Sequence, residues 1–171
     1  MPKETKPKTK PKRRSKLYEP LTLVFVRSVD DRIPRVFLSR WVDHIVRHLS
    51  SMPLSSVADR RLRACSELTL VFTSELEIQR LNREFRGKNK ATDVLSFAPT
   101  DEGSLGELVF SLSVLRKQAG EHGLTMNQEL GYMVLHGVLH LLGYDHETSP
   151  REARRMFELQ DKVFDAVLSR W

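Results

Sequence analysis

The residues with the clearest chemistry are three of the chain's six histidines, His136, His140 and His146, which fall within eleven positions. His136 and His140 are four residues apart in a segment with helical periodicity, so both rings should lie on one helix face, one turn apart. Gly143 follows, and glycine readily adopts the positive φ that ends a helix and turns the chain back, which would bring His146 to the same point. Three neutral imidazoles and one water complete the tetrahedral coordination of a catalytic zinc ion. The spacing therefore predicts one Zn²⁺ per chain, held by these three histidines.

The segment that carries the first two histidines is apolar on nearly all sides, which is typical of a buried helix. Buried imidazoles need polar partners, and a metal ion would provide one for both at once. The alternative interpretation is a pair of core histidines bonded to backbone carbonyls. The other histidines lack this pattern: His44 and His48 have no third ligand or turn glycine and are expected at the surface, and His122 suits a helix end.

The spacing H-x3-H-x5-H, with glycine three positions after the second histidine, also occurs in metzincin peptidases. Those enzymes carry a glutamate directly after the first histidine, where it serves as the general base. Here that position is Gly137, which has no side chain to accept a proton. A zinc metallopeptidase is therefore the weaker alternative, since its base would have to come from elsewhere in the fold.

The surrounding sequence predicts the elements that must position these histidines. Runs of β-branched and aromatic residues indicate four strands, at 21–26, 68–73, 94–97 and 107–112. Helical periodicity and N-terminal capping signals indicate helices at 35–49, 74–85 and 125–142, and another that begins at 149–150. The pattern predicts an α/β (α+β) fold with one sheet packed by four to five helices, and it leaves the strand order and directions open.

Three blocks of sequence resemble the YbeY family of bacterial endoribonucleases. They are HGVLHLLGYDH at 136–146, a stretch from LN at 81–82 through FRGK at 85–88 to TDVLSF at 92–97, and LGELV at 105–109. The resemblance implies a mixed four-stranded sheet, a zincin-like three-histidine zinc site and cleavage of single-stranded RNA. It implies a role in ribosomal RNA maturation, including 16S rRNA 3′-end processing, and in ribosome quality control. The implied partners are ribosomal RNA and the small ribosomal subunit, with a ribosome-associated GTPase and a small-subunit ribosomal protein as further candidates.

The resemblance also places a functional arginine at Arg86, and it makes Arg86 and His136 the catalytic candidates. A guanidinium fits phosphate and would offset the negative charge that builds up during RNA cleavage, whereas the alternative role of Arg86 is to pair with a helix dipole. Lys88 and Lys90 would add contacts to the RNA backbone. Asp145 either orients a ligand imidazole or bonds its own backbone in a turn.

Two further residues and one further class of function stay open. Tyr144 either stacks on a base or packs, and Glu107 is a weaker candidate for a general base. The third class is a non-catalytic RNA-binding ribosome assembly factor with a structural zinc ion. Structural zinc sites usually have four protein ligands, and only three clear ones are present, although a fourth from Asp145 would favour this class.

The charge of the chain is unevenly distributed. Residues 1–16 hold six Lys, two Arg and one Glu, a net charge of +7, whereas the whole 171-residue chain carries +6 and residues 17–171 therefore −1. We expect a disordered basic tail over 1–16, either an arm for RNA phosphates or a solubilising extension, and a single catalytic domain over 17–171.

The apolar runs and the cysteine content of the chain indicate its cellular compartment. No apolar run approaches the ~20 residues that cross a bilayer, and the N-terminus lacks the apolar core of a secretory signal. Cys65 is the only cysteine, so no internal disulfide can form. We therefore expect a cytoplasmic protein with no membrane partner.

Overall fold

A single mixed sheet forms the centre of the fold. The computed structural model describes residues 20–29 and 32–171, and the predicted basic tail over 1–16 lies outside them. Four strands form the sheet: β1 (Thr22–Arg27), β2 (Glu67–Thr73), β3 (Val94–Phe97) and β4 (Ser104–Ser111). Their order is β1-β2-β4-β3, with β1, β2 and β4 parallel and β3 antiparallel to β4. The mixed four-stranded sheet that the family resemblance implies is therefore confirmed.

Helices account for most of the remaining described residues. They are α1 (Arg35–Ser50), α2 (Ser56–Ala64), α3 (Glu75–Arg86), α4 (Leu112–His122), α5 (Met126–Leu141) and α6 (Pro150–Leu168). The expectation of four to five helices was too low, because α2 and α4 carry weak sequence signals. In α2 only Ala58 and Leu62 are buried, so it has little apolar stripe. Helix α4 begins directly after β4, so the apolar pattern of the strand continues into it.

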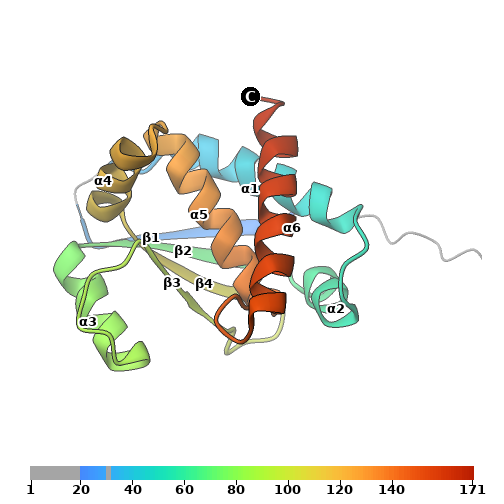
Figure 1. Ribbon diagram of the computed structural model, residues 1–171, viewed down its shortest axis with the longest axis horizontal. Helices are drawn as coiled ribbons and strands as arrows, with labels where there is room; N and C mark the ends of the chain where they lie inside the picture. The colour runs from blue at the N-terminus through green and yellow to red at the C-terminus, as the bar shows by residue number, and fades with distance from the viewer. Residues whose placement is uncertain (1–19, 30–31) are drawn as a thin grey trace, which may run out of the picture.

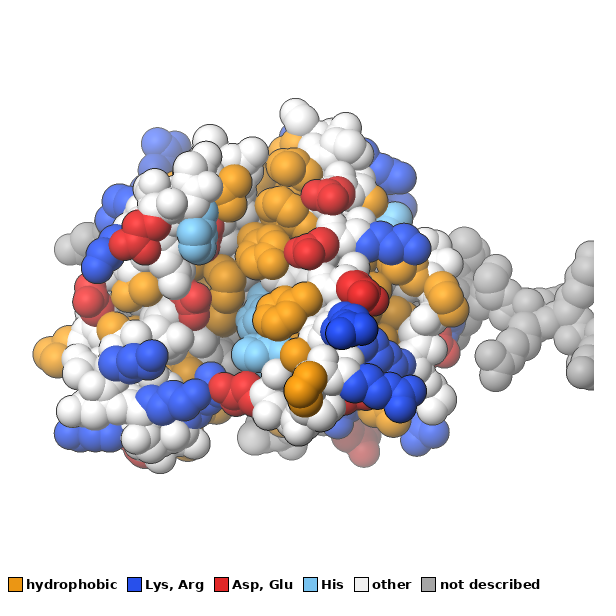
Figure 2. All heavy atoms as spheres, viewed as in Figure 1, with side chains coloured by type: hydrophobic (Ala, Val, Ile, Leu, Met, Phe, Trp, Pro, Cys, Tyr) orange, Lys and Arg blue, Asp and Glu red, His pale blue; other side chains and the backbone are white. Residues whose placement is uncertain are grey.

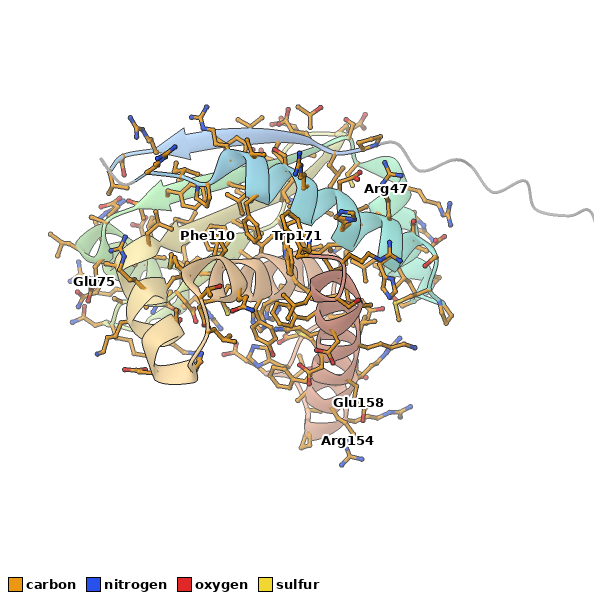
Figure 3. All side chains as sticks on the ribbon, turned by 90° about the horizontal axis from the view of Figure 1, so that it is seen from above. Arg47, Glu75, Phe110, Arg154, Glu158 and Trp171 are labelled. Carbon is orange, nitrogen blue, oxygen red and sulfur yellow. The ribbon has the colours of Figure 1, made fainter. Side chains whose placement is uncertain are left out.

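The two faces of the sheet are covered unequally (Figure 1). On one face the alternating side chains of β2 and β4, including Leu70 and Phe110, join the main hydrophobic core with α1, α4 and α5. Phe110 lies between the sheet and these helices in Figure 3, and α6 packs on α1 and α5. On the other face, Ile78 of α3 forms a smaller cluster with Leu95 and Val109, against which four partly buried hydrophobic residues pack, namely Val71, Leu81, Ala91 and Phe97. The rest of that second face borders a cavity that is lined by Thr69, Glu107 and their neighbours.

Local capping explains where the helices that carry the site begin. Thr125 and Gln128 form a complete capping box at the start of α5. At the start of α6 the Ser149 hydroxyl accepts from the backbone N–H of Glu152, and a proline follows at the first helical position. None of the helices in the described ranges is both long and apolar enough to span a membrane.

Candidate metal centre

The turn after α5 brings the third histidine back to the first two. Gly143 has φ +96°, and its N–H donates to the carbonyl of His140, while the N–H of Tyr144 donates to the carbonyl of Leu139. This pair of hydrogen bonds is the Schellman motif, which needs a left-handed residue at its centre. Glycine at this position lets the helix end sharply, and the chain carries His146 back against the helix face.

The three imidazoles converge as the spacing predicts. Their ligand atoms all lie within 4.8 Å of one another, and no other group of His, Cys, Asp or Glu in the described part of the chain does the same. The Nε2 atoms of His136 and His140 are 3.2 Å apart. Two nitrogens bound tetrahedrally at ~2.0–2.1 Å from one zinc ion would be about 3.3 Å apart. The donor atoms therefore fit a single metal ion of this size.

A buried glutamine orients the first of these histidines. Gln160 of α6 is fully buried, and its Oε1 lies 2.9 Å from Nδ1 of His136. With this oxygen as the acceptor, Nδ1 carries the proton and Nε2 keeps its lone pair for a metal. Helix α6 therefore fixes both the ring orientation and the tautomer of His136.

Burial keeps two of the imidazoles neutral. Desolvation lowers the pKa of His136, and it is also the largest cause that lowers the pKa of His140 to about 4. The neighbouring histidines lower the pKa of His140 further. A neutral imidazole is the form that binds a metal ion, so these rings are ready to bind one at neutral pH.

The histidines line a cavity of about 800 Å³ that is walled by β3, the end of α3, and the facing parts of α5 and α6. Figure 2 shows histidine side chains in a hollow of this face, with hydrophobic side chains beside them. Arg86 lines the same cavity. It is the last residue of α3, which ends at Gly87 in a left-handed conformation. The predicted arginine and the histidine cluster are therefore brought together.

A carboxylate that the sequence analysis missed binds two of the predicted cations. Glu147 forms ion pairs with Arg86 and, at 3.1 Å, with Lys88. Glu147 follows the third histidine, but its partners are about 60 residues away in sequence, so no local pattern signals the contact.

Lys90 is exposed, and it is not among the residues that line the cavity in the described part of the structure. Gln160 could have been found from the sequence, because it is a polar residue at a buried position of the apolar stripe of α6.

The residues next to His146 take mainly structural roles. Asp145 lines the cavity, but its Oδ1 accepts from the backbone N–H of Glu147 at 2.8 Å, as expected for a turn aspartate. It does not belong to the cluster of potential ligands. Tyr144 is buried, and the guanidinium of Arg155 lies over its ring. Tyr144 therefore packs, and it is not available to stack on a base.

The position of the peptidase base is closed by packing. Gly137 faces β4, where an added Cβ would lie 2.6 Å from Cδ2 of Leu108. Atoms that close overlap, so even alanine would displace the fully buried Leu108 side chain. The close packing of α5 on the sheet therefore leaves no room for a glutamate at position 137.

The remaining predicted groups lie elsewhere. Glu107 is exposed in a second cavity of about 650 Å³ on the open half of the sheet, which also contains Glu67, Glu77, Asp101 and Glu102 and no Lys or Arg among its described lining residues. His44 is half-buried, with its ring against Trp171. His48 is also half-buried. Both histidines were expected at the surface, and both are partly covered instead. His122 ends α4 and pairs with Glu129.

Comparison with known proteins agrees with this geometry. A model of the family described as Endoribonuclease YbeY matches residues 27–168. Endoribonuclease YbeY of Bdellovibrio bacteriovorus is 49% identical over 150 residues, which are 88% of this chain and 97% of that protein. Endoribonuclease YbeY of Persephonella marina is 40% identical over 147 residues, covering 82% and 88% of the two chains. The solution structure of TM1509 from Thermotoga maritima is similar with a TM-score of 0.58 at 27% identity, covering 88% of this chain and 91% of that one. The chain therefore belongs to the Endoribonuclease YbeY family.

Proposed function

We propose that the protein is a zinc-dependent endoribonuclease that cleaves single-stranded RNA and acts on ribosomal RNA. The observation that carries the proposal is the convergence of three imidazole donors and one arginine on a single cavity. The relatives named Endoribonuclease YbeY support RNA as the substrate. Processing of the 16S rRNA 3′ end, ribosome quality control, action on the small ribosomal subunit and a cytoplasmic location are proposed on the family resemblance.

In this proposal His136, His140 and His146 hold the metal ion, and they leave a fourth position open. A zinc ion would supply Lewis-acid polarisation of a phosphoryl oxygen and would acidify water. Gln160 holds the His136 ring in place through Nδ1. Asp145 shapes the turn that presents His146, through its hydrogen bond to the backbone of Glu147.

Arg86 is proposed as the group that binds the scissile phosphate. Its planar guanidinium can donate two parallel hydrogen bonds to phosphate oxygens, and its charge offsets the negative charge of the transition state. In the structure it pairs with Glu147 beside the histidines, so the RNA phosphate would compete with that carboxylate. Lys88 and, farther out, Lys90 would bind flanking phosphates.

The closing of position 137 argues against the peptidase alternative. A glutamate after the first histidine would meet Leu108 on the sheet side of the helix. The three-ligand cluster also argues against a purely structural zinc ion, because structural sites usually have four protein ligands.

The proposal is tested on the purified full chain by elemental analysis and by cleavage of a single-stranded ribosomal RNA fragment. We expect about one zinc ion per chain, and cleavage that a chelator abolishes and added zinc restores. His140→Ala should lose both the metal and the activity. The matched control is His44→Ala, a histidine on another helix outside the cluster, which should keep both. Cleavage by metal-free His140→Ala protein would refute the metal centre.

A further inference from the structure

Two exposed phenylalanines stand on the walls of the histidine cavity. Seven large hydrophobic residues of the described chain are exposed, and the two phenylalanines among them are Phe85 (60% exposed) and Phe157 (40% exposed). Both line the cavity, one from the end of α3 and one from α6. Exposed aromatic rings that gather at one site mark a binding surface more often than isolated exposed residues do.

The Phe157 ring lies beside two imidazole rings of the metal centre, tilted by 24–30° from their planes. Its centroid is 5.3 Å from that of His146, with 30° between the planes, and 6.5 Å from that of His136, with 24°. Its helix neighbour Met156 is buried and so is Gln160, so Phe157 sits at the rim of the packed face of α6. The ring therefore combines a supported position beside the histidines with a substantial exposed area.

Phe85 is held on the other wall. Its ring meets Phe97 of β3 edge-on, with centroids 5.1 Å apart, and the next residue is Arg86. The edge contact fixes the plane of the Phe85 ring and leaves most of the side chain exposed. An aromatic ring next to an arginine is the combination that single-stranded nucleic acids bind, with the base on the ring and the phosphate on the cation.

We propose that Phe157 and Phe85 are stacking platforms for unpaired bases, with Phe157 taking the base next to the phosphate at the metal centre. The proposal rests on the proposed function, since it assigns the bases of the RNA strand whose phosphate that function places between the histidines and Arg86. Bases in a duplex are already stacked on their neighbours, whereas bases of a single strand can splay out onto aromatic side chains. The two rings would therefore give the site its preference for single-stranded RNA.

The competing explanation is that Phe157 only shields the metal centre from water. The two explanations differ in what a substitution should do. Leucine keeps an apolar cover over His146 but has no flat π face, so Phe157→Leu separates shielding from stacking. Phe157→Trp keeps and enlarges the flat face.

The test measures binding of a short 2′-O-methyl RNA, which cannot be cleaved through its 2′ oxygen, to the zinc-loaded full chain. The strand carries 2-aminopurine, whose fluorescence is quenched by stacking, and it is used alone and annealed to its complement. Wild type and Phe157→Trp should quench the single strand and bind it more tightly than the duplex. In Phe157→Leu and Phe157→Ala we expect affinity for the single strand to fall roughly 5- to 150-fold, the range measured for one stacked base. Phe85→Ala should show a loss of the same kind. Leu76→Ala, an exposed residue on α3 that does not line the cavity, is the control and should behave as wild type.

The outcomes separate this inference from the proposed function. Wild-type quenching and affinity in Phe157→Leu would overturn it, as would a loss in Phe157→Ala that is fully explained by lost zinc and restored in Phe157→Leu. Normal quenching by a protein that cleaves no RNA would contradict the proposed function and leave the stacking platforms standing. Normal cleavage by wild type, with unchanged binding by Phe157→Leu and Phe157→Ala, would contradict the stacking platforms alone.

Discussion

Arg86 and Glu147 form an ion pair inside the histidine cavity and so join the end of α3 to the turn after α5. Glu147 follows His146 directly, so the pair holds the guanidinium beside the metal centre. Lys88 contributes most to lowering the pKa of Glu147, and Arg86 lowers it further. The carboxylate of Glu147 is therefore ionised at neutral pH, and it pairs with the Arg86 guanidinium when no phosphate is bound.

Removal of the guanidinium should affect chemistry more than binding. We expect Arg86→Ala to lower the single-turnover rate of RNA cleavage roughly 10²–10³-fold, the loss typical of a group that stabilises transition-state charge. RNA affinity should fall less, because Lys88 and Lys90 remain. Arg86→Lys should rescue poorly, since a point charge does not replace a planar fork. Near-normal cleavage by Arg86→Ala would remove Arg86 from the mechanism, and a large drop in melting temperature would show that it serves only the fold.

Removal of the competing carboxylate should have the opposite effect on binding. Glu147→Gln keeps the shape of the side chain but frees Arg86 and Lys88 from their partner. We expect RNA affinity to rise roughly two- to fivefold, in proportion to the small free energy of an exposed ion pair. The salt dependence of binding should also steepen, because more cations become available to phosphates. The measurement is a binding titration at several salt concentrations, and unchanged affinity would show that the ion pair does not compete with RNA.

The hydrogen bond from His136 to Gln160 should tune metal affinity. Gln160→Leu removes the acceptor for Nδ1, and we expect zinc affinity to fall about 10–100-fold, as for other groups that hold a metal-binding histidine. Gln160→Glu keeps an oxygen at this position and should retain most of the affinity. The measurement is competition for zinc with a chromophoric chelator. Glu158→Gln is the control, because Glu158 points into solvent from the same helix (Figure 3). Equal affinities in wild type and Gln160→Leu would count against this role.

The turn that carries His146 should be sensitive to a single methyl group. Gly143 has φ +96°, and a side chain in the left-handed region costs about 1–2 kcal/mol. We therefore expect Gly143→Ala to lower the free energy of unfolding by about that amount, as measured by urea denaturation. Gly120→Ala is the matched control in helix α4, where an added Cβ meets nothing within 4 Å. That exchange should stabilise the protein by about 0.5–1 kcal/mol, and similar effects of both exchanges would contradict the assigned strain.

The ion pair between His122 and Glu129 should make stability depend on pH. Nδ1 of His122 lies 3.0 Å from Oε2 of the buried Glu129, and this hydrogen bond is the main cause that raises the pKa of His122. Because the pKa is higher in the folded state than the value of about 6.5 in an unfolded chain, the pair stabilises the fold fully below that value. Its contribution is lost as the pH rises through the folded-state pKa.

We therefore expect the difference in unfolding free energy between wild type and His122→Gln to be largest near about pH 5 and to vanish by about pH 9. Urea denaturation across this range measures it. His48→Gln, at a histidine with no ion pair to any residue the structure describes, should give a difference that does not follow this pattern. A constant difference for His122→Gln would mean that the pair does not contribute.

Local sequence patterns predicted the elements and the metal-binding cluster, because both depend on short spacings. His136 and His140 are one helical turn apart, and a glycine turn returns His146, so the cluster is encoded within one segment. The fully buried Gln160 and the ion pair of Glu147 depend on how α6 and α3 pack, and no local spacing reports that packing. The two missed helices show the same limit, since α2 has almost no apolar stripe and α4 shares its apolar run with β4.

The acidic cavity on the open half of the sheet has a consequence for the route of the RNA strand. It meets the histidine cavity at Phe85 and Phe97, which line both. Beyond this border the lining includes Glu67 and Glu107 but no Lys or Arg among the described residues. The histidine cavity itself is lined by Arg61 and Arg86 together with three carboxylates, those of Asp93, Asp145 and Glu147. A phosphate backbone is repelled by the acidic side of the border, whereas on the other side two arginines and the proposed metal ion offset the carboxylates. The RNA strand should therefore leave the metal centre on the side away from the acidic cavity. The carboxylates of that cavity would act as an electrostatic barrier to RNA on the open part of the sheet.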